Sequence, residues 1–307
     1  MGLVTALVCT CNRPASIGKS VRALLANEGE LEVIVVDQTP GPETGNALAA
    51  LTADPRLRYV HSSTRGKGAA LNAGLRLARS ELVICSDDDC EAPPGWVSGM
   101  ARALEVQSTA AVAFCNVIAS SYDRSAGYVP TYERRKSRLL RSIGETCAGH
   151  GLGAGMALRR DAILALGGFD ESIGPGAFFP AGDDWDIAQR ALLSGWHVYE
   201  TAEVAIVHEG FRSFAQGREH ARRDWIGIGA VCAKPLRAGR WSALVVPVWE
   251  FTAHALLPPL LDLVRLRRPT GMSRIAGFLQ GFATGLRTPV DPKTLLFERP
   301  LTGPGRD

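Results

Sequence analysis

Short aliphatic runs alternate with amphipathic stretches over the first part of the chain. The runs have the length of buried strands and cover residues 3–8, 31–36, 57–60, 82–85 and 110–114. The stretches between them carry apolar residues at helical spacing and cover residues 14–27, 45–53, 68–79 and 93–106. This alternation predicts an α/β fold with a mostly parallel central sheet and helices on both faces. The connections between parallel strands are expected to be right-handed.

The middle of the chain is less regular. A basic stretch at residues 134–141 is expected on a helix or a mobile loop. Alternate glycines at residues 149–155 precede a strand at 156–158, and a helix is predicted over 182–194, with Gly195 placed to end it. Two short strands at 198–199 and 204–207 are expected to follow.

The character of the sequence changes near residue 215. Residues 241–264 are strongly apolar, but Glu250, His254 and Asp262 interrupt them and three prolines break the run. A membrane-spanning helix needs about 20 apolar residues with few charges, so we expect an amphipathic helical pair instead. Attachment to a membrane surface and packing against the body or a second subunit both fit this pattern. We therefore expect a catalytic domain at residues 1–214 and a largely helical extension at residues 215–307.

Charge is distributed unevenly between these two parts. The net charge is +3, but residues 211–307 hold 15 Lys and Arg against 7 Asp and Glu, a balance of +8. A basic tail fits contact with anionic lipid or a phosphate-bearing substrate, and a solvated basic surface fits equally well. Trp225 beside Arg222 and Arg223 is too small a feature to indicate nucleic-acid binding.

Composition and cysteine usage indicate a cytoplasmic protein. The 307 residues, 46% of them hydrophobic, are enough to bury a full core. Seven cysteines are an odd number, and several lie in apolar runs, which favours buried, reduced thiols. Met1 leads straight into a strand-like run, so no signal peptide is expected.

The strongest chemical feature is the acidic triplet Asp87, Asp88 and Asp89, directly after the strand-like run 82–85. Ligands in α/β sheets bind at the carboxyl ends of strands. Two carboxylates about 4 Å apart repel by about 4 kcal/mol at an effective dielectric of 20, so three together favour a bound cation. Oxygen ligands suit Mg²⁺ or Mn²⁺, which in turn holds a diphosphate. A solvated acidic turn is the alternative that the triplet alone leaves open.

Four further features fit a nucleotide site. Asp37 ends the strand-like run 31–36, on the same predicted sheet edge. The segment 65–68, Arg-Gly-Lys-Gly, precedes a helix that carries Asn72 and forms a natural anion site. A glycine turn occupies residues 167–171, and residues 182–186, Gly-Asp-Asp-Trp-Asp, place carboxylates on the first turn of a helix, where the helix dipole favours them.

Together these motifs resemble a family 2 inverting glycosyltransferase with the GT-A fold, over about residues 3–210. The matching parts, in order, are residues 10–13, Asp37, residues 65–66 with Asn72, the Asp87-x-Asp89 motif, the Gly-Gly-Phe-Asp turn, the pair at 183–184, and residues 207–208. The chain departs from the usual pattern at residues 38–40, where Gln-Thr-Pro replaces Asp-Gly-Ser, and at Asp183, where Glu is more usual.

The resemblance implies a nucleotide-sugar site at the sheet edge. Asp37 is expected to hydrogen-bond the nucleobase, with Thr10 and Asn12 lining the same pocket, while Asp87 and Asp89 bracket the ribose and the metal. The residues that it implies for this site are Thr10, Asn12, Arg13, Asp37, Arg65, Lys67, Asn72, Asp87 and Asp88.

The resemblance also implies catalytic and metal-binding roles. Asp89 is expected to ligate Mn²⁺ or Mg²⁺, with His208 completing the metal site or contacting the diphosphate. Asp184 is expected to act as general base, and Asp183 and Trp185 to lie in the acceptor region, although Trp185 fits a core position equally well.

The expected function is therefore metal-dependent, inverting transfer of a sugar from a nucleotide-diphosphate donor, UDP-linked rather than dTDP- or GDP-linked, to a hydroxyl group. The acceptor is expected to be a glycan, a lipid-linked molecule or a small molecule. A nucleotidyltransferase on a related sheet is an alternative, but it needs a glycine-rich loop after the first strand, where residues 9–13 hold no glycine. A non-catalytic nucleotide-binding homologue is the second alternative, and the presence of every expected carboxylate argues against it.

Overall fold

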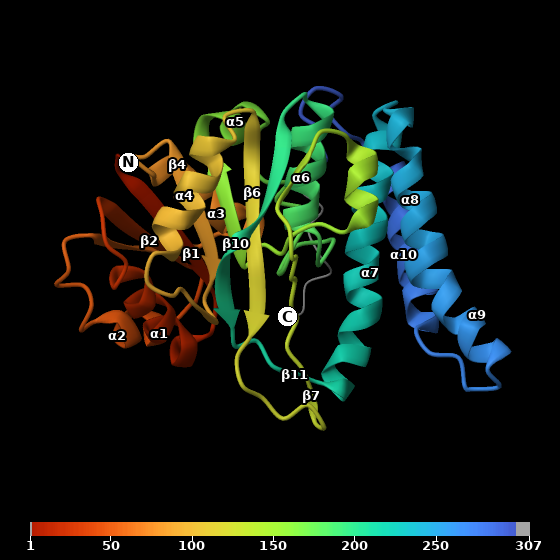
Figure 1. Ribbon diagram of the computed structural model, residues 1–307, viewed down its shortest axis with the longest axis horizontal. Coiled ribbons are helices and arrows are strands. Elements are labelled where there is room, and N and C mark those ends of the chain that lie inside the picture. Colours follow the sequence, from red (N-terminus) through yellow and green to blue (C-terminus); the bar gives the residue numbers. More distant parts are fainter. Residues whose placement is uncertain (1, 299–307) are drawn as a thin grey trace.

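The computed structural model describes residues 2–298 and is organised around one nine-stranded sheet (Figure 1). The strands follow the order β3-β2-β1-β4-β9-β6-β10-β5, and β8 pairs with β10. Their bounds are β1 Val4–Thr10, β2 Leu31–Asp37, β3 Leu57–His61, β4 Leu82–Asp87, β5 Cys90–Glu91, β6 Ala110–Ala119, β8 Arg138–Leu140, β9 Gly155–Arg159 and β10 His197–His208.

The larger part of the sheet is parallel, as the sequence predicted. Strands β3, β2, β1 and β4 run parallel, and β6 runs parallel to β10, whereas β9 is antiparallel to both of its neighbours, β4 and β6. The register pairs Thr10 with Asp37 and Cys9 with Asp87. The carboxyl ends of β1, β2 and β4 therefore form one edge.

Helices cover both faces of the sheet because alternate strand residues point to opposite sides. Even positions of β1, such as Ala6, pack with α1 (Pro14–Leu25), α2 (Glu43–Leu48) and α4 (Trp96–Val106). Leu7 on the same strand instead packs with the helices of the other face. Those are α3 (Lys67–Leu77), α5 (Arg160–Ala165) and α6 (Asp183–Leu193).

Two predicted elements differ in extent from those observed. The helix expected over residues 45–53 is the shorter α2, which begins at Glu43 and ends at Leu48. The two strands expected at 198–199 and 204–207 are one strand, β10, with an irregular register between Glu200 and Ala205. A bulge interrupts strand periodicity, which explains why the sequence suggested two short strands.

The expectation of a helix or mobile loop for the basic stretch 134–141 was wrong. Residues Arg138–Leu140 form β8, and a 3₁₀ helix, η1, follows at Ile143–Ala148. Arg134 and Arg138 both pair with the buried carboxylate of Glu200, at 3.2 and 2.5 Å. These two arginines are therefore fixed by an internal charge, since a buried carboxylate needs such partners.

Beyond the sheet lie a short two-stranded sheet, formed by β7 (Gly127–Tyr128) and β11 (Arg212–Ser213), and the helices of the extension. Helix α7 (Phe214–Arg237) opens the extension and α10 (Met272–Arg287) packs along it. Between them, one helical run covers residues 241–264, made of η2 (Trp241–Leu244), α8 (Val245–Trp249), the π-helical η3 (Glu250–Leu256) and α9 (Leu257–Val264). Figure 1 shows these helices as a layer to one side of the sheet.

The expectation that prolines divide residues 241–264 into a helical pair was wrong. The wider π-helical turn η3 directly precedes Pro258 and Pro259, so the helical direction continues where a regular α-helix would clash with the proline rings. By length and composition this run could cross a membrane, and 22% of its most apolar window is buried in the protein.

Glycines let α10 approach α7 closely. Gly277, Gly281 and Gly285 recur every fourth residue along the face of α10 that contacts α7, and a Cβ at Gly281 would lie 1.9 Å from the backbone oxygen of Ile226. Small residues at this spacing allow two helix backbones to touch. The predicted boundary at residue 214 coincides with the first residue of α7, but the division into a domain at 1–214 and an extension at 215–307 stays a prediction.

Replacing Gly281 with alanine should therefore destabilise the fold, although alanine is normally the better helix former. The added methyl would meet backbone rather than a movable side chain, so we expect a loss of about 1–3 kcal/mol in the free energy of unfolding. Gly144→Ala is the matched control, because its Cβ would find its nearest neighbour, Val245 Cγ1, at 3.6 Å. Thermal unfolding of the two variants checks this, and equal Tm values would contradict the tight α7–α10 packing.

Candidate functional site

The candidate site lies at the edge where β1, β2 and β4 end. Lys67, at the start of α3, donates to Asp87 Oδ1 at 2.5 Å. Arg13, which follows β1, lies 3.1 Å from Asp88 Oδ1 and 2.6 Å from Asp89 Oδ2. Each member of the acidic triplet therefore has a cationic partner from a neighbouring segment, which offsets the repulsion that three adjacent carboxylates would otherwise have.

Asp88 is the inward-facing member of the triplet. It is buried, and its Oδ2 accepts a hydrogen bond of 2.6 Å from the Thr10 hydroxyl. Burial raises the pKa of Asp88 to about 6, although the bond from Thr10 and the charge of Arg13 act in the opposite direction. Asp88 thus positions Thr10 and Arg13, and it offers little surface to a ligand.

Asp89 and His208 are the residues that could hold a metal. His208 Nε2 lies 3.4 Å from Asp89 Oδ1, and His208 Nδ1 lies 2.9 Å from the carbonyl oxygen of Pro130. With Nδ1–H donated to that carbonyl, loss of the Nε2 proton to an incoming metal would leave the Nε2 lone pair free to bind the metal, the arrangement typical of a metal-ligating histidine. One carboxylate oxygen and one imidazole nitrogen form a donor set that suits Mn²⁺, so these residues fit the metal that the resemblance implies.

Without a metal, Asp89 and His208 interact directly, and each favours the charged form of the other. Burial would raise the pKa of Asp89, but His208 and Arg13 outweigh it and lower that pKa to about 2. Burial would lower the pKa of His208, but the hydrogen bonds with Asp89 and Pro130 raise it. Cys90 Sγ also lies within 4.8 Å of both ligand atoms, but burial raises the pKa of this thiol, which leaves it neutral and a weak ligand.

Asp184 lies on the first turn of α6, and its carboxylate is held by two backbone N–H groups. Gly153 N donates to Oδ2 and Trp185 N donates to Oδ1, both at 2.8 Å. Gly153 belongs to the glycine segment before β9, and a Cβ there would lie 3.4 Å from Asp184 Oδ2 and 3.6 Å from Lys67 Nζ. Lys67 therefore lies between Asp87 and Asp184, which links the acidic triplet to the start of α6.

Asp183 is buried next to this pair. Burial raises the pKa of Asp183 to about 7; Lys67 lowers it, and the neighbouring Asp184 raises it. The acid is therefore partly protonated at neutral pH, which limits the negative charge gathered around Lys67. The structure thus brings Asp183 to the site, but as a buried neighbour of Asp184.

Asp37 is brought to the same edge but is fully buried. The Tyr59 hydroxyl donates to its Oδ2 at 2.7 Å, and Thr39 N donates to its Oδ1 at 2.8 Å. Beside it, a cavity of about 370 Å³ is lined by Asn12, Thr39 and residues of the adjoining loops. Asn12 is exposed at this cavity, whereas Thr39 is buried, and its hydroxyl accepts a hydrogen bond of 2.8 Å from Asn12 N.

Two predicted contacts do not lie where the resemblance places them. The amide of Asn72 is buried and bonds the Gly-Gly-Phe-Asp turn, donating to Phe169 O at 3.0 Å and accepting from Phe169 N at 2.7 Å. Trp185 is buried in the core and stacks on His150, with ring centroids 4.9 Å apart. Asn72 therefore holds a turn, and Trp185 is a core residue that offers no wall to an acceptor. Arg65 lies exposed just before α3.

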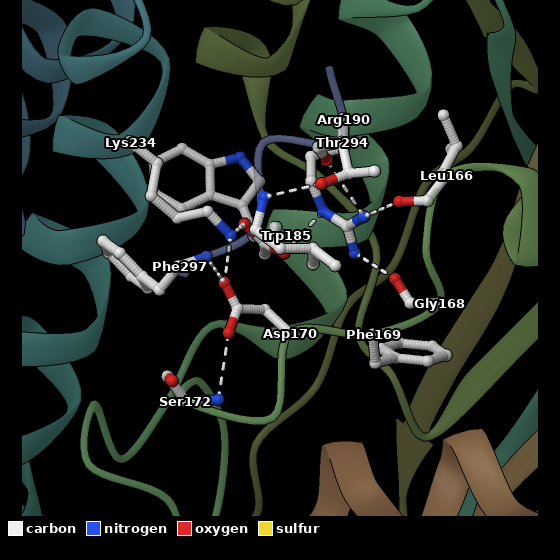
Figure 2. A network of polar contacts seen from close by, with 12 residues as sticks. Leu166, Gly168, Phe169, Asp170, Ser172, Trp185, Arg190, Lys234, Thr294 and Phe297 are labelled. Carbon is white, nitrogen blue, oxygen red and sulfur yellow. Dashed lines mark hydrogen bonds and ion pairs between the residues drawn. The ribbon is translucent and has the colours of Figure 1, made fainter. Parts of the chain in front are cut away.

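A buried polar network lies behind Asp184 (Figure 2). Lys234 of α7 is fully enclosed and donates to Asp170 Oδ2 at 2.7 Å and to Asp186 Oδ1 at 2.6 Å. Arg190 binds the other oxygen of Asp186 at 2.9 Å and donates to the carbonyls of Leu166 and Gly168. Two cations thus neutralise two carboxylates, and they join α7, α6 and the glycine turn.

Sequence reasoning missed this network and the role of Gly153. Asp170 and Asp186 are visible in the sequence, but their partner Lys234 is 48 residues beyond Asp186. A lysine in the middle of the apolar segment 230–236 was the one available signal, because buried lysines need a paired charge.

Comparison with protein families gives one match. The family described as "Glycosyl transferase family 2" matches residues 5–167, slightly more than half of the chain. That interval contains the acidic triplet, Lys67 and the glycine segment before β9, but it ends before α6 and Asp184.

Two curated relatives are similar to this chain in sequence over part of their length. The chain is 38% identical over 88 residues to "Succinoglycan biosynthesis protein ExoO" of Rhizobium meliloti, covering 28% of this chain and 25% of that protein. It is 24% identical over 279 residues to "Pre-mycofactocin glycosyltransferase" of Mycobacterium tuberculosis, covering 87% of this chain and 54% of that protein. The chain therefore spans about half or less of the length of these relatives.

Solved structures share the fold. A mannosyltransferase from Pyrobaculum calidifontis, determined with GDP-Man and Mn²⁺, superposes with a TM-score of 0.64 at 20% identity, covering 92% of this chain and 86% of that one. S. aureus TarS 1-349, determined with UDP-GlcNAc, gives a TM-score of 0.57 at 14% identity over 92% and 91% of the two chains. These similarities show that the sheet and its helices have the GT-A fold.

Replacing Lys234 with methionine should strongly destabilise the protein. The change leaves Asp170 and Asp186 buried without their shared cation, so we expect a loss of about 3–5 kcal/mol in the free energy of unfolding. Arg237→Met, an exposed position one turn further along α7, is the control and should change it by less than about 0.5 kcal/mol. Denaturant unfolding compares the two, and similar losses would show that the network contributes no stability.

Proposed function

The chain belongs to glycosyl transferase family 2, and from this premise we propose that it transfers a sugar from a nucleotide-diphosphate donor to a hydroxyl group of an acceptor, with inversion at the anomeric carbon. One observation carries the proposal: Lys67 pairs with Asp87 of the acidic triplet and lies beside Gly153, whose N–H binds Asp184 on α6. A leaving-group site and a base at one sheet edge are what a direct sugar transfer requires.

The diphosphate end of the donor would lie between Asp89, Lys67 and the start of α3. The first N–H groups of a helix and a nearby lysine attract phosphate oxygens. Mn²⁺ or Mg²⁺ held by Asp89 and His208 would supply Lewis acidity to the departing diphosphate. Arg13 and Arg65 add positive charge at the same edge, and Arg13 is already placed by Asp88.

The nucleoside end would lie near the cavity lined by Asn12 and Thr39. Buried Asp37 accepts a hydrogen bond from Thr39 N and so fixes the backbone of Thr39 at the rim of that cavity. Asp37 would therefore affect nucleobase binding through the position of Thr39 and not by direct contact. We propose UDP as the nucleotide. The two solved relatives contain GDP-Man and UDP-GlcNAc respectively, so a screen of nucleoside diphosphates by thermal shift is the direct test of this choice.

Asp184 would take the proton of the acceptor hydroxyl as its oxygen attacks the anomeric carbon. The new C–O bond forms as the bond to the diphosphate breaks, and the nucleoside diphosphate departs with that electron pair. A single attack from the opposite face inverts the centre, through a transition state with oxocarbenium character. The N–H groups of Gly153 and Trp185 orient the carboxylate, and each oxygen keeps a lone pair for the proton.

We propose a cytoplasmic enzyme whose acceptor is a glycan, a lipid-linked molecule or a small molecule, and whose extension, residues 215–307, contacts a membrane surface or a second copy. The names of the two relatives refer to succinoglycan biosynthesis and to pre-mycofactocin, which supports a glycan or a small molecule as the acceptor. Release of pyrophosphate in place of a nucleoside diphosphate would instead favour the nucleotidyltransferase alternative.

Asp184→Asn should leave donor binding nearly unchanged and lower turnover at least 100-fold, because the amide cannot accept the acceptor's proton. Asp161→Asn is the matched control, at an exposed carboxylate on α5, and should retain full turnover. Nucleoside diphosphate release and calorimetric binding of UDP measure the two effects separately. Turnover retained in Asp184→Asn would remove this residue from the mechanism.

Removing the divalent metal should abolish turnover, and Mn²⁺ should restore it, because the leaving diphosphate then regains its counter-charge. His208→Gln should weaken Mn²⁺ binding in the presence of UDP at least 10-fold by losing one ligand, whereas His197→Gln, at the other end of β10, should not. Calorimetric titration of Mn²⁺ into the UDP-saturated protein provides the measurement. Full turnover in excess chelator would show that the reaction needs no metal.

A further inference from the structure

An apolar stripe runs along the outer surface of the helical run 241–264. Its exposed members recur at spacings of three and four residues on both sides of the π-helical turn η3. Trp241 is 69% exposed and Val264 is 80% exposed, at the two ends of the run. The stripe consists of Trp241, Leu244, Val245, Val248, Trp249, Leu257, Leu260, Leu261 and Val264.

The apolar surface continues past the end of α9 and onto α10. Leu266, in the connection between the two helices, is 96% exposed, and Met272, Leu279 and Leu286 of α10 are also exposed. Single exposed apolar residues are ordinary, but a contiguous patch indicates a binding partner. The patch therefore has the character of an interaction surface.

Basic residues follow the stripe directly. Arg265, Arg267 and Arg268 are all exposed, and the nearby carboxylate of Asp262 is occupied by the N–H and hydroxyl of Thr270 at 2.9 and 2.6 Å. An apolar helix face with a cluster of arginines at its end matches an anionic lipid surface, where the side chains enter the acyl boundary and the arginines meet the head groups. A protein partner would not require both an apolar helix face and a cluster of arginines at its end.

The opposite face of the run is attached to the protein. Ala243, Val246 and Ala255 are buried, and Phe251 packs on Phe278 of α10 with ring centroids 5.4 Å apart. Because η2, α8 and η3 are held by other elements of the protein, this part of the run presents only its outer face to lipid and lies in the plane of the interface. Trp241 and Trp249 on the outer face suit the boundary between head groups and acyl chains.

We propose that the outer face of residues 241–268 docks on an anionic bilayer surface without crossing it. In Figure 1 the arrowhead of β6 points toward the end of the molecule where α9 lies, and the last residue of β6, Ala119, pairs with His208 of the candidate site. The α9 part of the docked surface thus lies on the same side of the molecule as the site, whereas α8 lies toward the opposite side. This deepens the proposed function, since an acceptor carried by a lipid would meet the site there, but the docking itself does not depend on transferase activity.

Flotation of the full chain with vesicles tests the docking. We expect binding to vesicles containing phosphatidylglycerol, little binding to pure phosphatidylcholine, and release in 1 M salt, where screening acts over about 3 Å. The triple change R265Q, R267Q and R268Q should lower the partition coefficient roughly 100-fold. The triple change R22Q, R58Q and R76Q, at exposed arginines on α1, β3 and α3, removes the same charge and should have little effect.

A second pair of variants tests the apolar stripe. Val264→Ser should lower the partition coefficient roughly 10-fold, because the residue no longer gains from entering the apolar layer. Val106→Ser is the matched control, since Val106 is 66% exposed on α4, away from the stripe.

Three outcomes would overturn the proposal. The first is absence of binding to phosphatidylglycerol vesicles. The second is equal, salt-resistant binding to neutral vesicles, which would indicate insertion. The third is a concentration-dependent dimer that Val264→Ser dissociates, which would assign the stripe to a second copy. Flotation needs no turnover, so its failure is distinguishable from failure of the proposed reaction.

Discussion

The candidate site depends on the compensation of negative charge at one edge of the sheet. Parallel register aligns the carboxyl ends of β1, β2 and β4, which brings Asp37 and the acidic triplet to the same edge of the sheet. Lys67 and Arg13 then supply the cations that allow these carboxylates to lie so close together. Because Lys67 also lies beside Asp183 and Asp184, the same lysine couples the nucleotide side of the edge to the start of α6.

A second set of buried charges fixes the position of α6 from behind. Asp186 lies two residues after Asp184, and it is bound by Arg190 on its own helix and by Lys234 on α7. A shift of α7 would therefore be transmitted to the first turn of α6 through a charge pair that has no water to replace it. This connection gives the extension a part in holding the candidate base, besides the outer surface that it offers to lipid.

The sequence was sufficient for the fold and for bringing the acidic residues to one edge of the sheet, because both depend on local patterns. Strand ends follow from aliphatic runs, so Asp37 and Asp87–Asp89 could be placed at one edge before any coordinates. Such patterns do not predict which way each acidic side chain points. Asp88 faces inward, where the Thr10 hydroxyl binds it, and Arg13 binds both Asp88 and Asp89. These contacts join residues more than 70 positions apart.

The errors have the same origin. Asn72 was assigned to a ligand contact from its neighbours in the sequence, and Trp185 was left open between an acceptor and a core position, whereas the contacts with Phe169 and His150 make both residues structural. The arginines at 134 and 138 were expected on a helix or a mobile loop because their partner, Glu200, lies on a strand far along the chain. Long-range pairing of charges is the property that hydrophobic periodicity does not encode.

The central claim is that one sheet edge holds the metal and the diphosphate on one side and the base on the other. A crystal structure of the protein with Mn²⁺, UDP and an unreactive sugar donor, with Mn²⁺ located by its anomalous scattering, tests it most directly. The account predicts Mn²⁺ bound by Asp89 and His208 and bridging the diphosphate, with the carboxylate of Asp184 facing the anomeric carbon from the opposite side. Mn²⁺ at any other set of ligands, or a sugar turned away from Asp184, would contradict it.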